Sequence, residues 1–141
     1  MAGVVREGAE MVAGMNPVLD PVPYVFCTDA RDGARDWSEV FPRALALFRE
    51  DEGISLVLPL DEARGFDLPC DMPMRRITLG VFSALDGVGL TAAVAGALAA
   101  RGIACNVIAA FHHDHVFVPQ ADADAAMAAL RQCQGRTADD Q

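Results

Sequence analysis

The spacing of apolar residues changes along the chain, and in the second half it predicts a compact order of elements. Residues 77–82 alternate apolar and polar positions as a strand does, and residues 89–101 repeat their apolar positions at helical spacing. Two further apolar runs, 103–111 and 115–119, are close enough to form an antiparallel hairpin. A last helix is predicted from Ala123 to Cys133. The order β-α-β-β-α is a ferredoxin-like βαββαβ unit that lacks its sixth strand.

The first half gives weaker patterns of the same kind. The elements predicted there are a short helix at 5–15, an extended proline-containing lead-in, a strand at 24–28, a loop at 29–36, a helix between Pro42 and Gly53, a strand at 54–59 and one helical turn at 61–64. The predicted helix between Pro42 and Gly53 has Phe41, Leu45 and Phe48 at helical spacing. This β-α-β pattern is also incomplete.

An aperiodic, proline-rich segment at 66–74 is the best internal boundary. We therefore expect an N-terminal half at 1–65, a linker at 66–74, a C-terminal domain at 75–134 and a flexible polar tail at 135–141. The tail cannot supply the sixth strand. Because unpaired strand edges promote aggregation, we expect that strand to come from elsewhere in the chain or from a dimer mate.

Composition excludes several classes of protein. Hydrophobic residues make up 52% of the 141, which is enough for a core, and the net charge is −9 with scattered arginines and no lysine. Nucleic-acid and anionic-membrane partners are therefore disfavoured, as is Schiff-base chemistry. No secretion signal begins the chain, and its longest weakly polar stretch, 87–100, is too short to span a bilayer. Four cysteines without a CxxC pair are typical of a reducing, cytoplasmic compartment.

Two glycines mark the first candidate site. Gly87 and Gly89 leave the backbone bare where a helix begins, so its N–H groups could take a ligand carboxylate with help from the helix dipole. Asp86 or Asp114 could then take an ammonium group. The alternative is structural: Asp86 caps the helix and the glycines only make a turn.

The polar cluster at 112–115, His-His-Asp-His, is the second candidate site. Neighbouring side chains on a strand point to opposite faces, so at most two of the four converge, and a metal site is disfavoured. A role for His113 or His115 in lining a ligand site or an interface is more consistent with this pattern, beside plain turn chemistry. The sequence contains no nucleophile elbow, Walker motif or dinucleotide fingerprint, so we expect no cofactor.

The run ITLGVFSALDGVGLTAAVAGALAARGIACNVIAAFHHDHVFVP resembles an ACT domain, with DGVG as the turn, an alanine-rich helix, and GIACN leading into an apolar strand. Together with YVFCT, FPRALALFREDEG and ISLVLP upstream, it is similar to a little-characterised bacterial group of short tandem-ACT proteins. Val88 stands where the family commonly has proline. The resemblance implies an α+β, ferredoxin-like fold with two ACT-like units packed side by side.

ACT domains bind amino acids between paired units and pass the signal to attached proteins, and the resemblance implies the same role here. The ligand-binding residues that it implies are Asp86, Gly87, Val88, Gly89, Leu90 and Thr91, with Asn106 opposite, and His113 and His115 join them as candidates. We therefore expect a cytoplasmic, homodimeric regulatory module that binds a small molecule, with an amino acid as the expected ligand, and that has no catalysis, cofactor or metal. The alternatives are an oligomerisation or partner-docking module with vestigial pockets, and a small enzyme that uses the cluster from His112 to His115.

Overall fold

The structure is a computed structural model that describes residues 3–28 and 35–139. It divides into two compact units. One, which we call the split unit, combines Met1–Asp20 with Arg75–Gln141, and the other, the continuous unit, is Pro21–Met74. This division differs from the expected one, since the first residues of the chain belong with the C-terminal part and not with an N-terminal half at 1–65.

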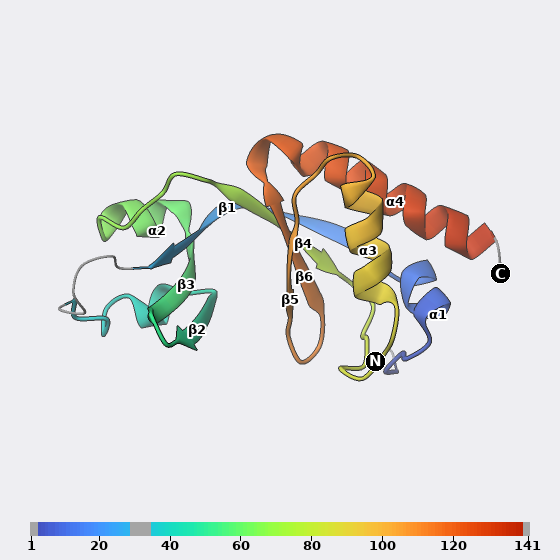
Figure 1. The fold of residues 1–141 in the computed structure, drawn as a ribbon, viewed down its shortest axis with the longest axis horizontal. Helices are drawn as coiled ribbons and strands as arrows, with labels where there is room; N and C mark the ends of the chain where they lie inside the picture. Colours follow the sequence, from blue (N-terminus) through green and yellow to red (C-terminus); the bar gives the residue numbers. More distant parts are fainter. Residues whose placement is uncertain (1–2, 29–34, 140–141) are drawn as a thin grey trace. The chain divides into compact units, whose positions relative to one another are not determined.

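The split unit contains all the elements predicted for the second half, together with two from the start of the chain (Figure 1). Its elements are α1 (Gly8–Ala13), the beginning of β1 (Pro17–Thr28), β4 (Met74–Leu79), α3 (Leu90–Ala99), β5 (Asn106–Ala109), β6 (Asp114–Pro119) and α4 (Ala123–Asp139). Its strands lie in the order β1-β4-β6-β5. Residues 17–20 of β1 therefore supply the missing sixth strand from within the same chain.

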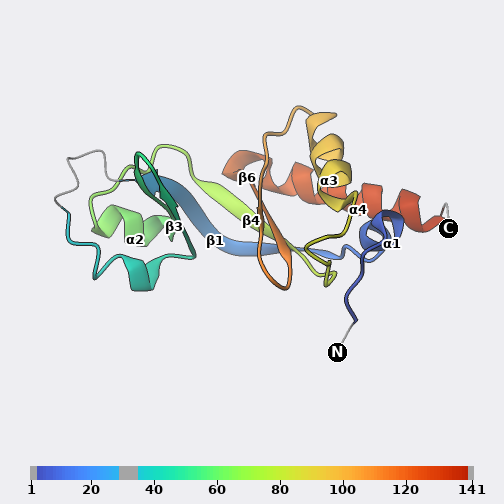
Figure 2. The ribbon, with the colours of Figure 1, turned by 60° about the horizontal axis from the view of Figure 1, so that its bottom comes forward.

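Helices α1, α3 and α4 pack against one another, as both views of the ribbon show (Figure 1, Figure 2). Their apolar residues form one core with alternate residues of the strands, among them Ile77, Leu79, Val116 and Val118, all less than 2% exposed. The helix predicted at 123–133 extends further, because α4 continues to Asp139 through most of the expected flexible tail. Strand β5 begins only at Asn106, and residues 103–105 lead into it.

The continuous unit is a small sheet with one helix. Strand β3 (Gly53–Pro59) lies between β2 (Ala46–Glu50) and the second part of β1, and α2 (Leu60–Gly65) packs beside β3. A separate core includes Val25, Leu56, Leu58 and Ala63. Pairing between β1 and β3 begins at Tyr24, so the prolines of the expected lead-in lie inside β1 but before this ladder.

The helix predicted between Pro42 and Gly53 is wrong. Only a short 3₁₀ turn, η1 (Phe41–Arg43), forms there, and β2 follows it. Glu50 pairs with Gly53, so Asp51 and Glu52 make a two-residue hairpin turn, and Gly53 adopts a φ of 145°. Leu45 and Leu47 alternate as apolar residues do in a strand, although Phe41, Leu45 and Phe48 also have helical spacing. Pairing with β3 selects the strand over the helix. The strand at 54–59 and the helical turn at 61–64 are confirmed, while most of the loop predicted at 29–36 lies outside the described residues.

None of the helices in the described part of the chain is both long and apolar enough to cross a bilayer.

Candidate functional site

The candidate site lies in the split unit, where the chain leaves β4 and enters α3. Gly89 is the residue before the helix and has a φ of 112°, a conformation that favours glycine. Ala93 N donates to Gly89 O as the first helical bond, so the amides of residues 90–92 have no acceptor within the helix. No side chain among the described residues caps them. The start of α3 therefore offers unpaired donors and a positive dipole end.

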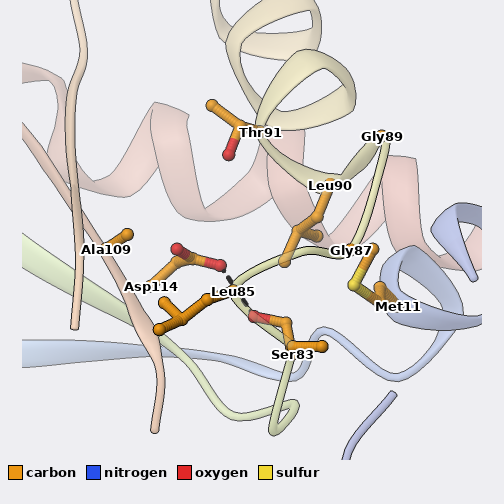
Figure 3. A pocket seen from close by; sticks show the side chains of 10 residues that line it. Met11, Ser83, Leu85, Gly87, Gly89, Leu90, Thr91, Ala109 and Asp114 are labelled. Carbon is orange, nitrogen blue, oxygen red and sulfur yellow. Dashed lines mark hydrogen bonds between the residues drawn. The ribbon is translucent and has the colours of Figure 1, made fainter. Parts of the chain in front are cut away.

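A pocket of about 150 Å³ lies beside this helix start (Figure 3). The residues that line it come from α1, from the segment 83–91, from β5 and from the start of β6: Met11, Ser83, Ala84, Leu85, Gly87, Gly89, Leu90, Thr91, Ala109 and Asp114. Most of these groups are small or apolar. Its polar side chains are those of Ser83, Thr91 and Asp114.

Asp114 is the one acidic side chain among the residues that line the pocket. Strand alternation puts it on the same side of β6 as Val116 and Val118, which belong to the helix-covered core. Ser83 Oγ donates to Asp114 Oδ2 at 2.9 Å, and this bond fixes the carboxylate in the pocket. The second carboxylate oxygen and its remaining lone pairs can accept from a ligand.

The segment before β1 is hydrogen-bonded to the pocket loop. Val5 N donates to Phe82 O at 2.8 Å, and Ala84 N donates to Val5 O at 2.8 Å. Helix α1 then passes over the loop, so that a Cβ on Gly8 would lie 2.5 Å from Val88 O. The segment ends where Gly80 N donates to Met15 O at 2.6 Å. Both ends of this segment, which we call the strap (residues 4–15), are therefore fixed to the chain around the pocket.

The strap also covers Gly87 and Gly89, the two glycines of the predicted ligand site. A Cβ on Gly87 would lie 3.1 Å from Met11 Cε and Sδ, and one on Gly89 would lie 3.4 Å from Gly8 Cα. The side of each glycine on which a Cβ would lie thus faces the strap and not a ligand. What remains open to the pocket is their backbone and that of the first turn of α3.

Four of the nine predicted ligand residues line the pocket: Gly87, Gly89, Leu90 and Thr91. The other five, Asp86, Val88, Asn106, His113 and His115, lie outside the set that lines it, and their role in binding stays a prediction.

Asp86 and Val88 are both exposed, and neither lines the pocket. Asp86 does not cap α3; its carboxylate accepts from Arg6 Nε at 3.1 Å in an exposed ion pair. Val88 is 78% exposed. Asn106 is exposed at the start of β5, where it pairs with Phe117.

The histidines of the cluster have separate partners. His113 Nδ1 lies 3.2 Å from Val81 O, so it carries the proton in this bond, because a carbonyl only accepts. His115 Nδ1 lies 3.0 Å from Thr78 Oγ1 on β4, on the sheet face opposite to Asp114. His112 makes edge contacts with Phe82 and Phe111. Partial burial lowers the pKa of His115 below its ordinary 6.5, with Arg76 and His113 adding to the effect and Asp114 opposing it.

Within residues 3–28 and 35–139, no three His, Cys, Asp or Glu side chains are grouped so that they could hold a metal ion. All four cysteines, each among the described residues, are free. Burial, with the neighbouring Cys70 adding, raises the pKa of Cys27 to about 11, against an opposing effect of Arg35.

The sequence pattern does not point to Ser83 or Met11, and it indicates Asp114 only as an alternative to Asp86. Alternation along β6 could have placed Asp114 on the core side with Val116 and Val118. Met11 carries no comparable signal, because its position depends on α1 folding back over a loop more than seventy residues away in sequence.

Two family models, both described as ACT domain, match the chain in tandem, one at residues 5–75 and the other at 75–132. No curated protein matches. A solved structure from Vibrio cholerae, of a protein of unknown function described as a possible transport protein, is 38% identical, with a TM-score of 0.77 over 89% of this chain and 94% of that one.

More distant structures share the fold. The Agrobacterium tumefaciens protein Atu0741 is 22% identical, with a TM-score of 0.63 over 80% of this chain and 84% of that one. The ligand-free regulatory subunit of aspartate kinase from Thermus thermophilus is 13% identical, with a TM-score of 0.60 over 85% of this chain and 97% of that one. The fold is thus that of tandem regulatory domains, and the predicted α+β ferredoxin-like class is confirmed.

Proposed function

Since the chain belongs to the ACT domain family, whose domains are ligand-binding and regulatory, we propose that it binds a free amino acid in the pocket at the start of α3. The observation that carries the proposal is the pairing, in one pocket, of the Asp114 carboxylate with the uncapped end of a helix. These two groups have opposite electrostatic character. They suit the two charged ends of one small zwitterion.

The ligand carboxylate would lie at the first turn of α3, where the amides of residues 90–92 donate and the helix dipole is favourable. The ligand ammonium would donate to Asp114, which Ser83 holds in position. Each contact is a charge-assisted hydrogen bond, the strong kind in proteins. A neutral zwitterion also avoids the repulsion that a chain of net charge −9 exerts on simple anions.

Thermal unfolding in the presence of each free amino acid tests the proposal, because a ligand that binds only the folded state raises stability by RT ln(1 + [L]/Kd). Asp114→Asn keeps the size of the side chain but removes its charge, so the affinity of the best ligand falls by about tenfold or more. Asp124→Asn, at an exposed position in the first turn of α4, is the matched control and leaves binding unchanged. Equal affinity in the two variants would remove Asp114 from the site.

We also propose that the protein acts without catalysis and in the cytoplasm. His113 binds Val81 O and His115 binds Thr78 Oγ1. All three histidines of the cluster lie outside the set of residues that line the pocket, which gives no support to an enzyme built on that cluster. The four free cysteines support a reducing compartment.

A dimer is proposed on a different ground from the one that the sequence offered. The missing strand is supplied by β1, so no partner is needed to complete the split unit. Instead, Leu85, Val88 and Phe111 are 68%, 78% and 69% exposed on the loops before α3 and between β5 and β6. A second copy of the chain could cover these side chains. A partner-docking module, the alternative function, would use the same exposed residues. Light scattering of Val88→Ser beside the wild type tests this, and a wild-type monomer would contradict it.

A further inference from the structure

The pocket of the split unit has one wall that does not belong to the βαββαβ core. Met11, on α1, is 1% exposed, and its terminal atoms lie against Gly87 at the edge of the pocket. Figure 3 shows Met11 and Gly87 together, with Asp114 and Thr91 on the far side of the group. Asp114 and Thr91 thus lie away from Met11 in this view, while Ser83 lies between Asp114 and the methionine.

We infer that Met11 sets the size limit of the ligand, so that the site takes the smallest amino acids, such as glycine, alanine and serine, and rejects leucine and phenylalanine. The inference rests on the proposed function and deepens it. With the ammonium at Asp114 and the carboxylate at α3, the ligand side chain is the part left to point toward Met11.

The volume of the pocket supports this limit. A cavity of about 150 Å³ is the size that accommodates one benzene molecule in a protein core. Alanine and serine are about as large as benzene, whereas leucine is larger and phenylalanine contains a whole benzene ring beyond its Cβ. A larger side chain that is directed toward Met11 therefore needs the methionine to move.

Met11 is not free to move away with its helix. Met11 N donates to Glu7 O at 2.9 Å within α1, and the strap is fixed at both ends by the bonds of Val5 and Met15. Gly8 leaves no room between α1 and the loop, since its Cβ position is 2.5 Å from Val88 O. The wall can therefore give way only through the side chain of Met11 itself.

The experiment compares glycine, alanine and serine with leucine and phenylalanine as ligands of the full chain, by thermal unfolding and calorimetric titration. For the wild type, we expect the small amino acids to raise the melting temperature and leucine to bind roughly tenfold or more weakly, because a single excess methylene can already cost that much affinity. Met11→Ala removes the wall, so its affinity for leucine rises by a comparable factor. Met11→Leu, which keeps most of the volume in a shorter, branched side chain, is the second variant should the alanine variant unfold.

Met127→Ala is the matched control. Met127 is buried in the same core, 6% exposed, and lies outside the pocket, so its loss weakens packing without widening the site. This variant keeps the preference for small amino acids. A wild type that binds leucine as tightly as alanine, or a Met11 variant with unchanged preference, overturns the inference while the proposed function stands. If no amino acid of either size binds any of the proteins, the proposed function fails as well.

Discussion

Gly8 offers the sharpest test of how the strap meets the pocket loop, because one chemical change should have opposite effects at two glycines. Gly8 is the first residue of α1, and a Cβ there would lie 2.5 Å from Val88 O, a distance that real Cβ atoms essentially never show. Gly96, in the middle of α3, has nothing within 4 Å of its Cβ position. Alanine is therefore crowded at Gly8 and unhindered at Gly96.

The expected magnitudes follow from this geometry. To reach ordinary contact at 3.4 Å, Val88 O must retreat by about 0.9 Å, and overpacking of this kind costs about 1–3 kcal/mol. The shift also weakens the bond from Val88 N to Arg6 O, worth about 1 kcal/mol, while helix propensity returns at most about 1 kcal/mol. Gly8→Ala thus destabilises by about 2 kcal/mol, whereas Gly96→Ala stabilises by up to about 1 kcal/mol.

Thermal unfolding followed by circular dichroism measures both effects. At about 4 °C per kcal/mol, the melting temperature falls by about 8 °C in Gly8→Ala and rises by up to about 4 °C in Gly96→Ala. Gly135→Ala, in α4 and also without neighbours, repeats the control. A rise in all three variants would refute the close contact between α1 and the loop.

Three further predictions concern side chains. Burial lowers the pKa of His115 below 6.5, so the unfolded state binds more protons and the free energy of unfolding falls as the pH drops from about 6.5. In His115→Asn, the free energy of unfolding measured by urea denaturation changes less with pH in this range. A pH dependence equal to that of the wild type would contradict the lowered pKa. The thiol of Cys27, with its pKa raised to about 11, resists iodoacetamide at pH 8 until denaturant is added, and mass spectrometry of the labelled peptides checks this. Arg6→Ala breaks only an exposed ion pair with Asp86, so the free energy of unfolding changes by less than about 1 kcal/mol; a larger loss would show that charge, not backbone contact, holds the strap.

Elements were predicted correctly from the sequence where the local pattern of apolar residues agrees with the pairing and packing that the element adopts in the fold. The alternation at 77–82, the helical period of 89–101 and the hairpin around residues 112–114 all depend on near neighbours. The helix and the hairpin form, and the strand forms three residues earlier than predicted, at Met74–Leu79. The helix predicted after Pro42 failed because Phe41, Leu45 and Phe48 fit a helical period while Leu45 and Leu47 fit the alternation of a strand. Only the pairing of β2 with β3 selects the strand. Short apolar runs do not resolve this by periodicity.

The candidate site was predictable in part for the same reason. The turn at Gly87 and Gly89 and the helix start are local features, and they lie where the pattern put them. Alternation with Val116 and Val118 could have placed Asp114 on the core side of β6. Met11 reaches the pocket through the fold-back of α1, which single-sequence patterns do not encode. Asp86, the residue that local capping rules favoured, instead pairs with Arg6.

The position of residues 17–20 as the last strand of the split unit has a consequence for synthesis. These residues leave the ribosome well before β4, the strand beside them in that unit, which begins only at Met74. The continuous unit can collapse while the nascent chain is still growing, whereas the split unit must wait for α4. A fragment of residues 75–141 would lack both α1 and an edge strand, and we expect it to aggregate when expressed alone. Adding residues 1–20 as a separate peptide should restore its solubility, as in fragment complementation.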